Sequence, residues 1–182
     1  MKRPRARSPR KVPTASRRPQ GPVQVPSPEP VPASGRPARR AALALAVTDR
    51  GRPRTNLAFL RSVVRTTLHF VERPTMPVSL LLTGDAEIAQ LHARHLGDST
   101  PTDVISFEID GGAEIVISVE TALRNARHHG HSLRAEIALY IVHGILHTTG
   151  FDDIRARDRA RIRAAERAVM QRLRLDVHAV DA

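Results

Sequence analysis

One stretch, HGILHTTGFDD from His143 to Asp153, limits the possible fold and function of this chain more than any other. It completes an apolar run without proline, so we expect a helix that carries His143 and His147 on one face, where both imidazoles can reach one metal ion. Gly150 offers a place for the helix to end, and the acidic pair Asp152 and Asp153 can then return a carboxylate as a third ligand. Three protein ligands leave one position of a tetrahedral zinc ion open, which is typical of a catalytic site.

The same residues also have a purely structural interpretation. Two histidines four residues apart in an apolar helix could be core residues with satisfied hydrogen bonds, and Asp153 could cap the next helix. The helix-ending glycine and the acidic pair at the right offset favour a metal site, because each supplies something that a third ligand needs. We therefore predict a site of His143, His147 and Asp153, although spacing alone does not exclude Asp152 as the ligand.

The composition limits the kind of metal site and the kind of protein. The chain has no cysteine, so any zinc must take nitrogen and oxygen ligands. No apolar run reaches the length of a membrane span, and the N-terminus has no apolar segment of the signal-peptide kind. We therefore expect a soluble cytoplasmic protein that does not interact with a membrane.

The net charge of +11 is concentrated in a tail. Residues 1–40 contain eleven Lys and Arg, one acidic residue, ten of the fourteen prolines and no aromatic residue, so we predict that they are disordered. Their cations could bind phosphate without sequence preference. We favour a simpler interpretation, a solubilising extension or an upstream start codon in the gene model. Residues 41–182 hold eighteen basic and seventeen acidic residues and are predicted to form the folded domain.

The folded part alternates strand-like and helical segments. Strands are expected at 41–47, 78–82, 105–109 and 113–119, and Gly111 and Gly112 predict a hairpin that makes the last two antiparallel neighbours. Apolar residues at helical spacing and turn signals predict helices at 55–71, 85–95, 120–130, 132–149 and 154–173. This order predicts an α+β fold, in which a small mixed sheet of about four strands packs with helices and the metal site lies on a buried helix.

A second histidine group, His128, His129 and His131, surrounds Gly130, where a helix is expected to end with the glycine as its cap. Cations near a helix C-terminus interact favourably with the helix dipole, so we interpret this group as a polar loop rather than a metal site. The last predicted helix is rich in arginine, which we interpret mainly as a solvated face.

Gly144 separates the sequence from a familiar class of zinc enzyme. In HExxH metalloproteases, a glutamate that acts as general base follows the first histidine, whereas here that position is Gly144. This argues against peptide hydrolysis. A glycine inside a helix costs roughly 1 kcal/mol relative to alanine, so we expect a substrate or another backbone to approach closely there.

The motif HGILHTTGFDD resembles the HGxLHxxGxDH signature of the YbeY-type endoribonucleases, which are ribosomal RNA maturation factors. TDVISF at 102–107 and AEIVIS at 113–118 resemble that family's TDVLSF and GDIVIS, so three motifs occur in order within residues 41–175. The resemblance implies a zinc-dependent, single-strand-specific endoribonuclease with one Zn²⁺ per chain. It also implies a role in late small-subunit (16S) rRNA maturation and ribosome quality control, with ribosomal RNA and the small subunit as partners.

Two residues depart from the family pattern. Asp153 stands where the third ligand is usually histidine, which would leave the bound ion a net charge of about +1 instead of +2. Leu96 stands where many members carry an arginine for the RNA phosphate, and Arg94 is a nearby candidate to replace it. If Arg94 does not replace that arginine, the transition state loses a hydrogen-bond donor to the RNA phosphate. The alternative function is then a ribosome-associated binding factor with a chiefly structural zinc.

The resemblance also suggests roles for residues around the metal. Asp152 would be either a hydrogen-bond acceptor for a ligand imidazole or a helix cap. Thr102, Asp103 and Ser106 would shape the cleft beside the metal, or would serve only loop capping and strand-end hydrogen bonding.

Overall fold

The computed structural model describes residues 44–96 and 102–176. The predicted disordered tail, residues 1–40, lies outside the described residues. All the described elements belong to one unit, Ala38–Ala182. Within the described part of the chain, no helix is long and apolar enough to cross a membrane.

The structure confirms an α+β fold with a four-stranded mixed sheet. The strands are β1 (Leu45–Asp49), β2 (Val78–Thr83), β3 (Val104–Ile109) and β4 (Gly112–Ser118), in the spatial order β1-β2-β4-β3. β1, β2 and β4 run parallel to one another, and β3 is antiparallel to β4, as predicted. The helices are α1 (Leu57–Phe70), α2 (Asp85–Leu96), α3 (Val119–His129), α4 (Leu133–Thr148) and α5 (Ala156–Arg172).

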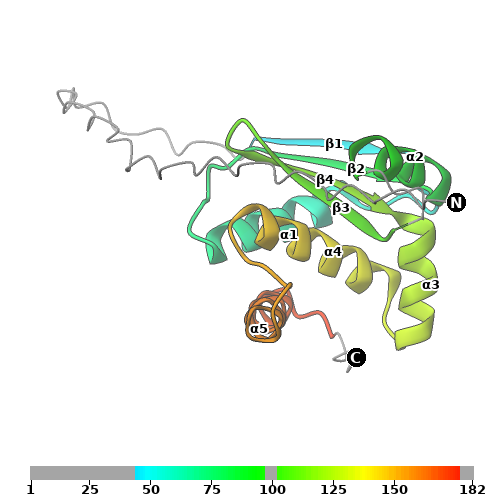
Figure 1. Cartoon of the computed structure of the whole chain (residues 1–182). Coiled ribbons are helices and arrows are strands. Elements are labelled where there is room, and N and C mark those ends of the chain that lie inside the picture. Colours follow the sequence, from blue (N-terminus) through cyan, green and yellow to red (C-terminus); the bar gives the residue numbers. More distant parts are fainter. Residues whose placement is uncertain (1–43, 97–101, 177–182) are drawn as a thin grey trace, which may run out of the picture. The chain divides into compact units, whose positions relative to one another are not determined.

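Helices cover both faces of the sheet, because side chains along each strand alternate between two cores. On β4, Ile115 and Ile117 belong to the larger core with α1 and α4, whereas Val116 joins Ile88 of α2 and Ile105 of β3 on the opposite face. α5 packs against α4 and α1 (Figure 1). α4 therefore lies between the sheet and α5, and this position buries it.

The hairpin between β3 and β4 forms one residue earlier than the glycine pair predicted. Ile109 pairs with Gly112, so the two turn residues are Asp110 and Gly111, with φ of 49° and 72°. Positive φ at both positions is typical of the type I′ turn, whose twist matches that of the flanking strands. Gly112 instead opens β4, where an added Cβ would lie 2.8 Å from the carbonyl oxygen of Pro77.

Several predicted boundaries were wrong by a few residues. The first strand was expected at 41–47 but is β1 at Leu45–Asp49, and the first helix was expected from residue 55 but α1 begins at Leu57. Val119 was expected to end a strand but begins α3, because the Ser118 side chain caps this helix by accepting a hydrogen bond from the Thr121 backbone N–H. α5 was expected from residue 154 but begins at Ala156.

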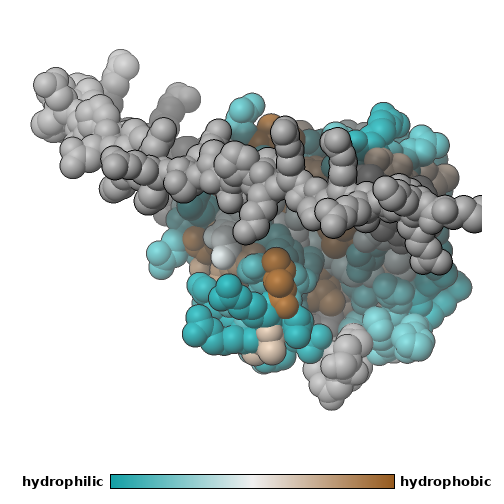
Figure 2. All heavy atoms as spheres, in the orientation of Figure 1, coloured by the Kyte–Doolittle hydropathy of each residue, from teal (hydrophilic) through white to brown (hydrophobic). Residues whose placement is uncertain are grey.

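The visible surface of the described residues is mainly hydrophilic, including the area over α5, and small hydrophobic areas interrupt it (Figure 2). Among the described residues, the large apolar side chains with substantial exposure are Leu57, Ile109 and Ile154. The described residues therefore offer no large apolar patch as a candidate functional site, and the candidates are clusters of polar side chains.

Candidate metal centre

α4 holds the two histidines in a fixed position. Ser132 caps the helix by accepting a hydrogen bond from the Ala135 N–H, and most of the helix is buried against the sheet and its neighbouring helices. His143 and His147 lie on the side that remains partly exposed. The chain then turns at Gly150, whose φ of 95° lies in the left-handed region that favours glycine. This turn brings the acidic pair back towards the histidines.

The structure brings the three predicted ligands together. His143, His147 and Asp153 each offer one ligand atom, and these atoms lie within 4.8 Å of one another. The Nε2 atom of His147 is 3.7 Å from Oδ2 of Asp153, and the two imidazole centroids are 4.4 Å apart. Bonds of about 2.0–2.2 Å in a tetrahedral zinc site place ligand atoms roughly 3.3 Å apart, so only small side-chain movements are needed. Two imidazoles and one carboxylate thus fit a zinc ion.

The structure separates the roles of the two neighbouring aspartates. The Oδ1 atom of Asp152 accepts backbone hydrogen bonds from Asp153 at 2.7 Å and from Ile154 at 3.2 Å. Its carboxylate therefore shapes the turn before α5, although the N-cap of that helix is Arg155. Asp153 faces His147 and is half-exposed, with 49% of its side-chain surface accessible. Asp153 is therefore the better-placed ligand.

Glu166 on α5 orients His143, and sequence reasoning missed this contact. The Nδ1 atom of His143 lies 2.7 Å from Oε1 of Glu166, which leaves Nε2 as the nitrogen for a metal ion. Burial alone would lower the pKa of His143. The hydrogen bond and negative charge of Glu166, with the charges of Asp103 and Asp153, outweigh burial and raise this pKa above its usual value. A carboxylate that holds a ligand imidazole is a common arrangement in zinc sites.

Two of the three candidate ligands, His143 and Asp153, line a cleft that α3, β3, α4 and α5 border, whereas His147 is not part of its described lining. Its lining includes Asp103, Tyr140, His143, Asp153, Arg163 and Glu166.

The arginines of α5 are mainly exposed, as expected, but two of them also contribute to this region. Nη1 of Arg159 donates to the carbonyl oxygens of Asp153 at 3.1 Å and Ile154 at 2.7 Å, so Arg159 holds the turn that carries Asp153. Arg163 is half-buried and lines the cleft, where its guanidinium can contact an anionic substrate. The run of arginines was the only sequence signal for either residue.

Of the other residues that were predicted near the cleft, one belongs to its described lining and three do not. Asp103 lines the cleft, and its Oδ1 atom accepts hydrogen bonds from the Val104 N–H at 2.8 Å and from the Thr102 hydroxyl at 3.2 Å. Thr102 and Ser106 are half-buried but do not belong to the described lining of the cleft. Arg94 is exposed in the last turn of α2 and also lies outside that lining, and Leu96 ends the same helix.

Comparison with known proteins places this chain in a family. The family model described as endoribonuclease YbeY matches residues 51–174, which is well over half of the chain. A Heliobacterium modesticaldum protein named endoribonuclease YbeY is 37% identical over 112 residues, covering 52% of this chain and 68% of that protein. The protein of the same name from Desulforamulus reducens is 34% identical over 131 residues, covering 64% of this chain and 86% of its own length.

The fold is also similar to a solved structure. The solution structure of TM1509 from Thermotoga maritima superposes with a TM-score of 0.52 at 21% identity, covering 71% of this chain and 91% of that one. This similarity concerns the fold, and the sequence relationships carry the assignment. The chain belongs to the YbeY endoribonuclease family.

Proposed function

We propose that this protein is a zinc-dependent endoribonuclease that cleaves single-stranded RNA. The observation that carries the proposal is the convergence of His143, His147 and Asp153, two of which line one cleft, in a chain of the YbeY endoribonuclease family. We place its activity in the cytoplasm, in late 16S rRNA maturation and ribosome quality control. Ribosomal RNA and the small ribosomal subunit are the proposed partners.

The donor set supports a hydrolytic site. A zinc ion bound there would act as a Lewis acid towards a phosphoryl oxygen and lower the pKa of a coordinated water. Glu166 would keep His143 in the orientation and tautomer that a ligand needs. Arg159 would hold the backbone next to Asp153, so that the third ligand is positioned before RNA arrives.

Arg163 supports RNA as the substrate. Its side chain lines the same cleft as His143 and Asp153, so a phosphate held near the metal would lie within reach of a guanidinium. A fixed cation near the developing negative charge of a phosphate stabilises the transition state. Arg163 is thus our candidate for the phosphate contact that the arginine position occupied by Leu96 would otherwise supply.

A second candidate function is a ribosome-associated binding factor with a chiefly structural zinc. It is favoured by Leu96 at the usual arginine position and by the location of Arg94 outside the described lining of the cleft. Under this alternative, Arg163 does not replace the missing donor and RNA is bound without cleavage.

The test is cleavage of a labelled single-stranded RNA by protein stripped with chelator, before and after zinc is returned. A duplex of the same sequence and a peptide substrate are assayed in parallel. We expect zinc to restore cleavage of the single strand only. Zinc-loaded protein that binds the RNA without cutting it would favour the binding factor, and peptide fragments would revive a peptidase, despite Gly144.

A further inference from the structure

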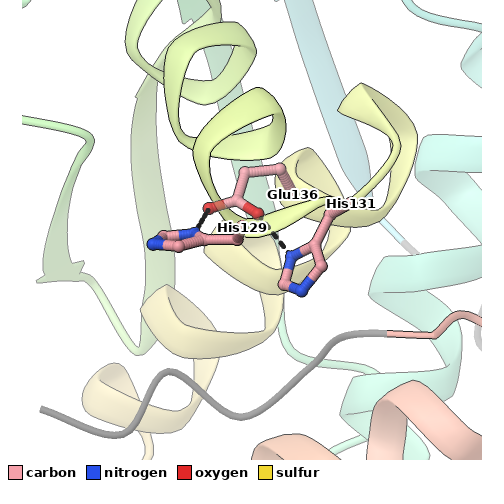
Figure 3. A group of neighbouring side chains, drawn as sticks. All are labelled: His129, His131 and Glu136. Carbon is pink, nitrogen blue, oxygen red and sulfur yellow. Dashed lines mark hydrogen bonds and ion pairs between the residues drawn. The ribbon is translucent and has the colours of Figure 1, made fainter.

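A second group of potential ligands lies where the chain reverses between α3 and α4. α3 ends at His129, Gly130 turns the chain with a φ of 72°, and His131 follows immediately. Glu136 lies in the first turn of α4. Figure 3 shows the two imidazoles on either side of the Glu136 carboxylate, each directed towards a different oxygen.

The Glu136 carboxylate is buried, with only 3% of its side-chain surface exposed. Burying a carboxylate is costly unless a cation or hydrogen-bond donors compensate its charge. The Nδ1 atom of His131 lies 3.0 Å from Oε2, whereas Nδ1 of His129 lies 3.8 Å from Oε1, beyond hydrogen-bond range. One oxygen therefore has a close imidazole partner and the other does not.

His129 supplies a second, independent observation. Its Nδ1 atom is buried and makes no hydrogen bond to any residue that the structure describes. A buried nitrogen without a partner costs free energy, and few such atoms occur in folded proteins. A protonated His131 would neutralise Glu136 but would leave His129 Nδ1 unpaired. A cation between the three side chains would satisfy both the carboxylate and this nitrogen.

The geometry and the donor chemistry agree. His129, His131 and Glu136 each offer one ligand atom within 4.8 Å of the others, the same limit that the first group meets. We propose that they form a second site for a divalent transition-metal ion, with Zn²⁺ and Co²⁺ as the best-matched ions for two imidazoles and a carboxylate. His129 and Glu136 also line the cleft that contains His143 and Asp153, so both ions would border one cleft.

The sequence alone led us to interpret these histidines as a polar loop, because it did not reveal their contact with Glu136. Glu136 belongs to the next helix, and the sequence did not show that its carboxylate is buried against the two imidazoles. The second site does not depend on the first, because the two groups share no ligand.

The test is metal stoichiometry, which needs no catalytic readout. The full chain is stripped, titrated with Co²⁺ and followed by its visible ligand-field absorption, and zinc content is measured by elemental analysis after reloading and desalting. We expect two ions per chain in the wild type and one in both His129→Gln and Glu136→Gln. His128→Gln is the matched control, because His128 is an exposed neighbour outside the group, and it should retain two ions.

Further variants separate this proposal from the first site. His147→Ala should lose one ion and retain the one at His129, His131 and Glu136. A thermal melt on each variant checks folding, and His129→Gln serves as the informative variant if Glu136→Gln does not fold. A single ion in the saturated wild type that disappears in His147→Ala would overturn the second site, as would two ions retained in folded His129→Gln.

Discussion

The imidazole of His143 on α4 lies 2.7 Å from the carboxylate of Glu166 on α5, although 23 residues separate them in the sequence. This contact ties a candidate metal ligand to the packing of two helices. It also selects which imidazole nitrogen is left for the metal. The orientation of the His143 imidazole as a metal ligand therefore depends on the packing of α5, although α5 contributes no ligand of its own.

Glu166→Ala should weaken zinc binding by about ten- to a hundredfold, because the loss of such a carboxylate releases the orientation of the ligand imidazole. Glu166→Gln should weaken it less, since the amide oxygen can still accept the hydrogen bond. Affinity is measured by competition with a chromophoric chelator. Arg167→Ala, an exposed change on the same helix, is the control. If Glu166→Ala and the wild type bound zinc with equal affinity, Glu166 would not be needed to orient His143.

Arg163→Ala should lower the rate of RNA cleavage by about 10²-fold or more, the loss typical of removing one donor to transition-state charge. Zinc content should not change, because Arg163 is not a ligand. Arg167→Ala again provides the comparison: it removes the same charge outside the described lining of the cleft and should keep nearly full activity. If both variants lose activity equally, the effect is general electrostatic attraction rather than a contact in the cleft.

Gly144→Ala should destabilise the metal-free protein by about 1 kcal/mol. The new Cβ would lie 3.1–3.3 Å from three side-chain atoms of Ile115, which is fully buried and has little room to move. Overpacking costs typically 1–3 kcal/mol, and the better helix propensity of alanine offsets roughly 1 kcal/mol. Denaturant unfolding measures the change.

Ile115→Val removes one of the three crowded atoms and supplies a double-mutant test. The loss caused by Gly144→Ala should be smaller in the Ile115→Val background than in the wild type. Equal losses in the two backgrounds would show that Ile115 is not what requires glycine at position 144.

Asp85→Asn should lower stability at neutral pH but not in strong acid. Burial alone would raise the pKa of Asp85, but hydrogen bonds from Arg124, Ser118 and Thr121 and the charge of Arg124 lower it from 3.8 to about 2. A depressed carboxyl pKa contributes stability above the unfolded value, and this contribution is lost as the pH falls through the folded value.

The Asp85 carboxylate is partly exposed, so we expect a modest loss of about 1 kcal/mol at pH 7. Urea unfolding of wild type and Asp85→Asn from pH 7 downwards should show the difference shrinking below about pH 4. A difference that remains constant down to pH 2.5 would mean that the charge of Asp85 is not responsible.

Local patterns predicted much of the fold. The strands, the pairing of β3 with β4, the C-terminal end of α3 and the start of α4 depend on alternation, glycine and serine caps, which act over a few residues. The spacing of His143, His147 and Asp153 was equally informative, since one helix and one turn bring them together.

Contacts between distant elements could not be read from the sequence. Glu166 and Arg163 reach the cleft only because of how α5 packs on α4. Gly144 was expected to admit a substrate or a backbone, but the structure shows the Ile115 side chain of β4 against it. Likewise, the role of Asp152 in the turn depends on which backbone N–H groups its carboxylate meets.

The most direct test of the proposed centre compares Asp153→Ala with Asp152→Ala. The two residues are adjacent, but Asp153 faces His147 whereas Asp152 holds the turn. Zinc content and single-stranded RNA cleavage are measured on the same samples, with His129→Gln in the background of every variant and of the reference protein so that only the first site is counted. We predict that Asp153→Ala loses both the ion and the cleavage, whereas Asp152→Ala retains the ion and part of the activity. Zinc and cleavage that survive in Asp153→Ala would contradict the account.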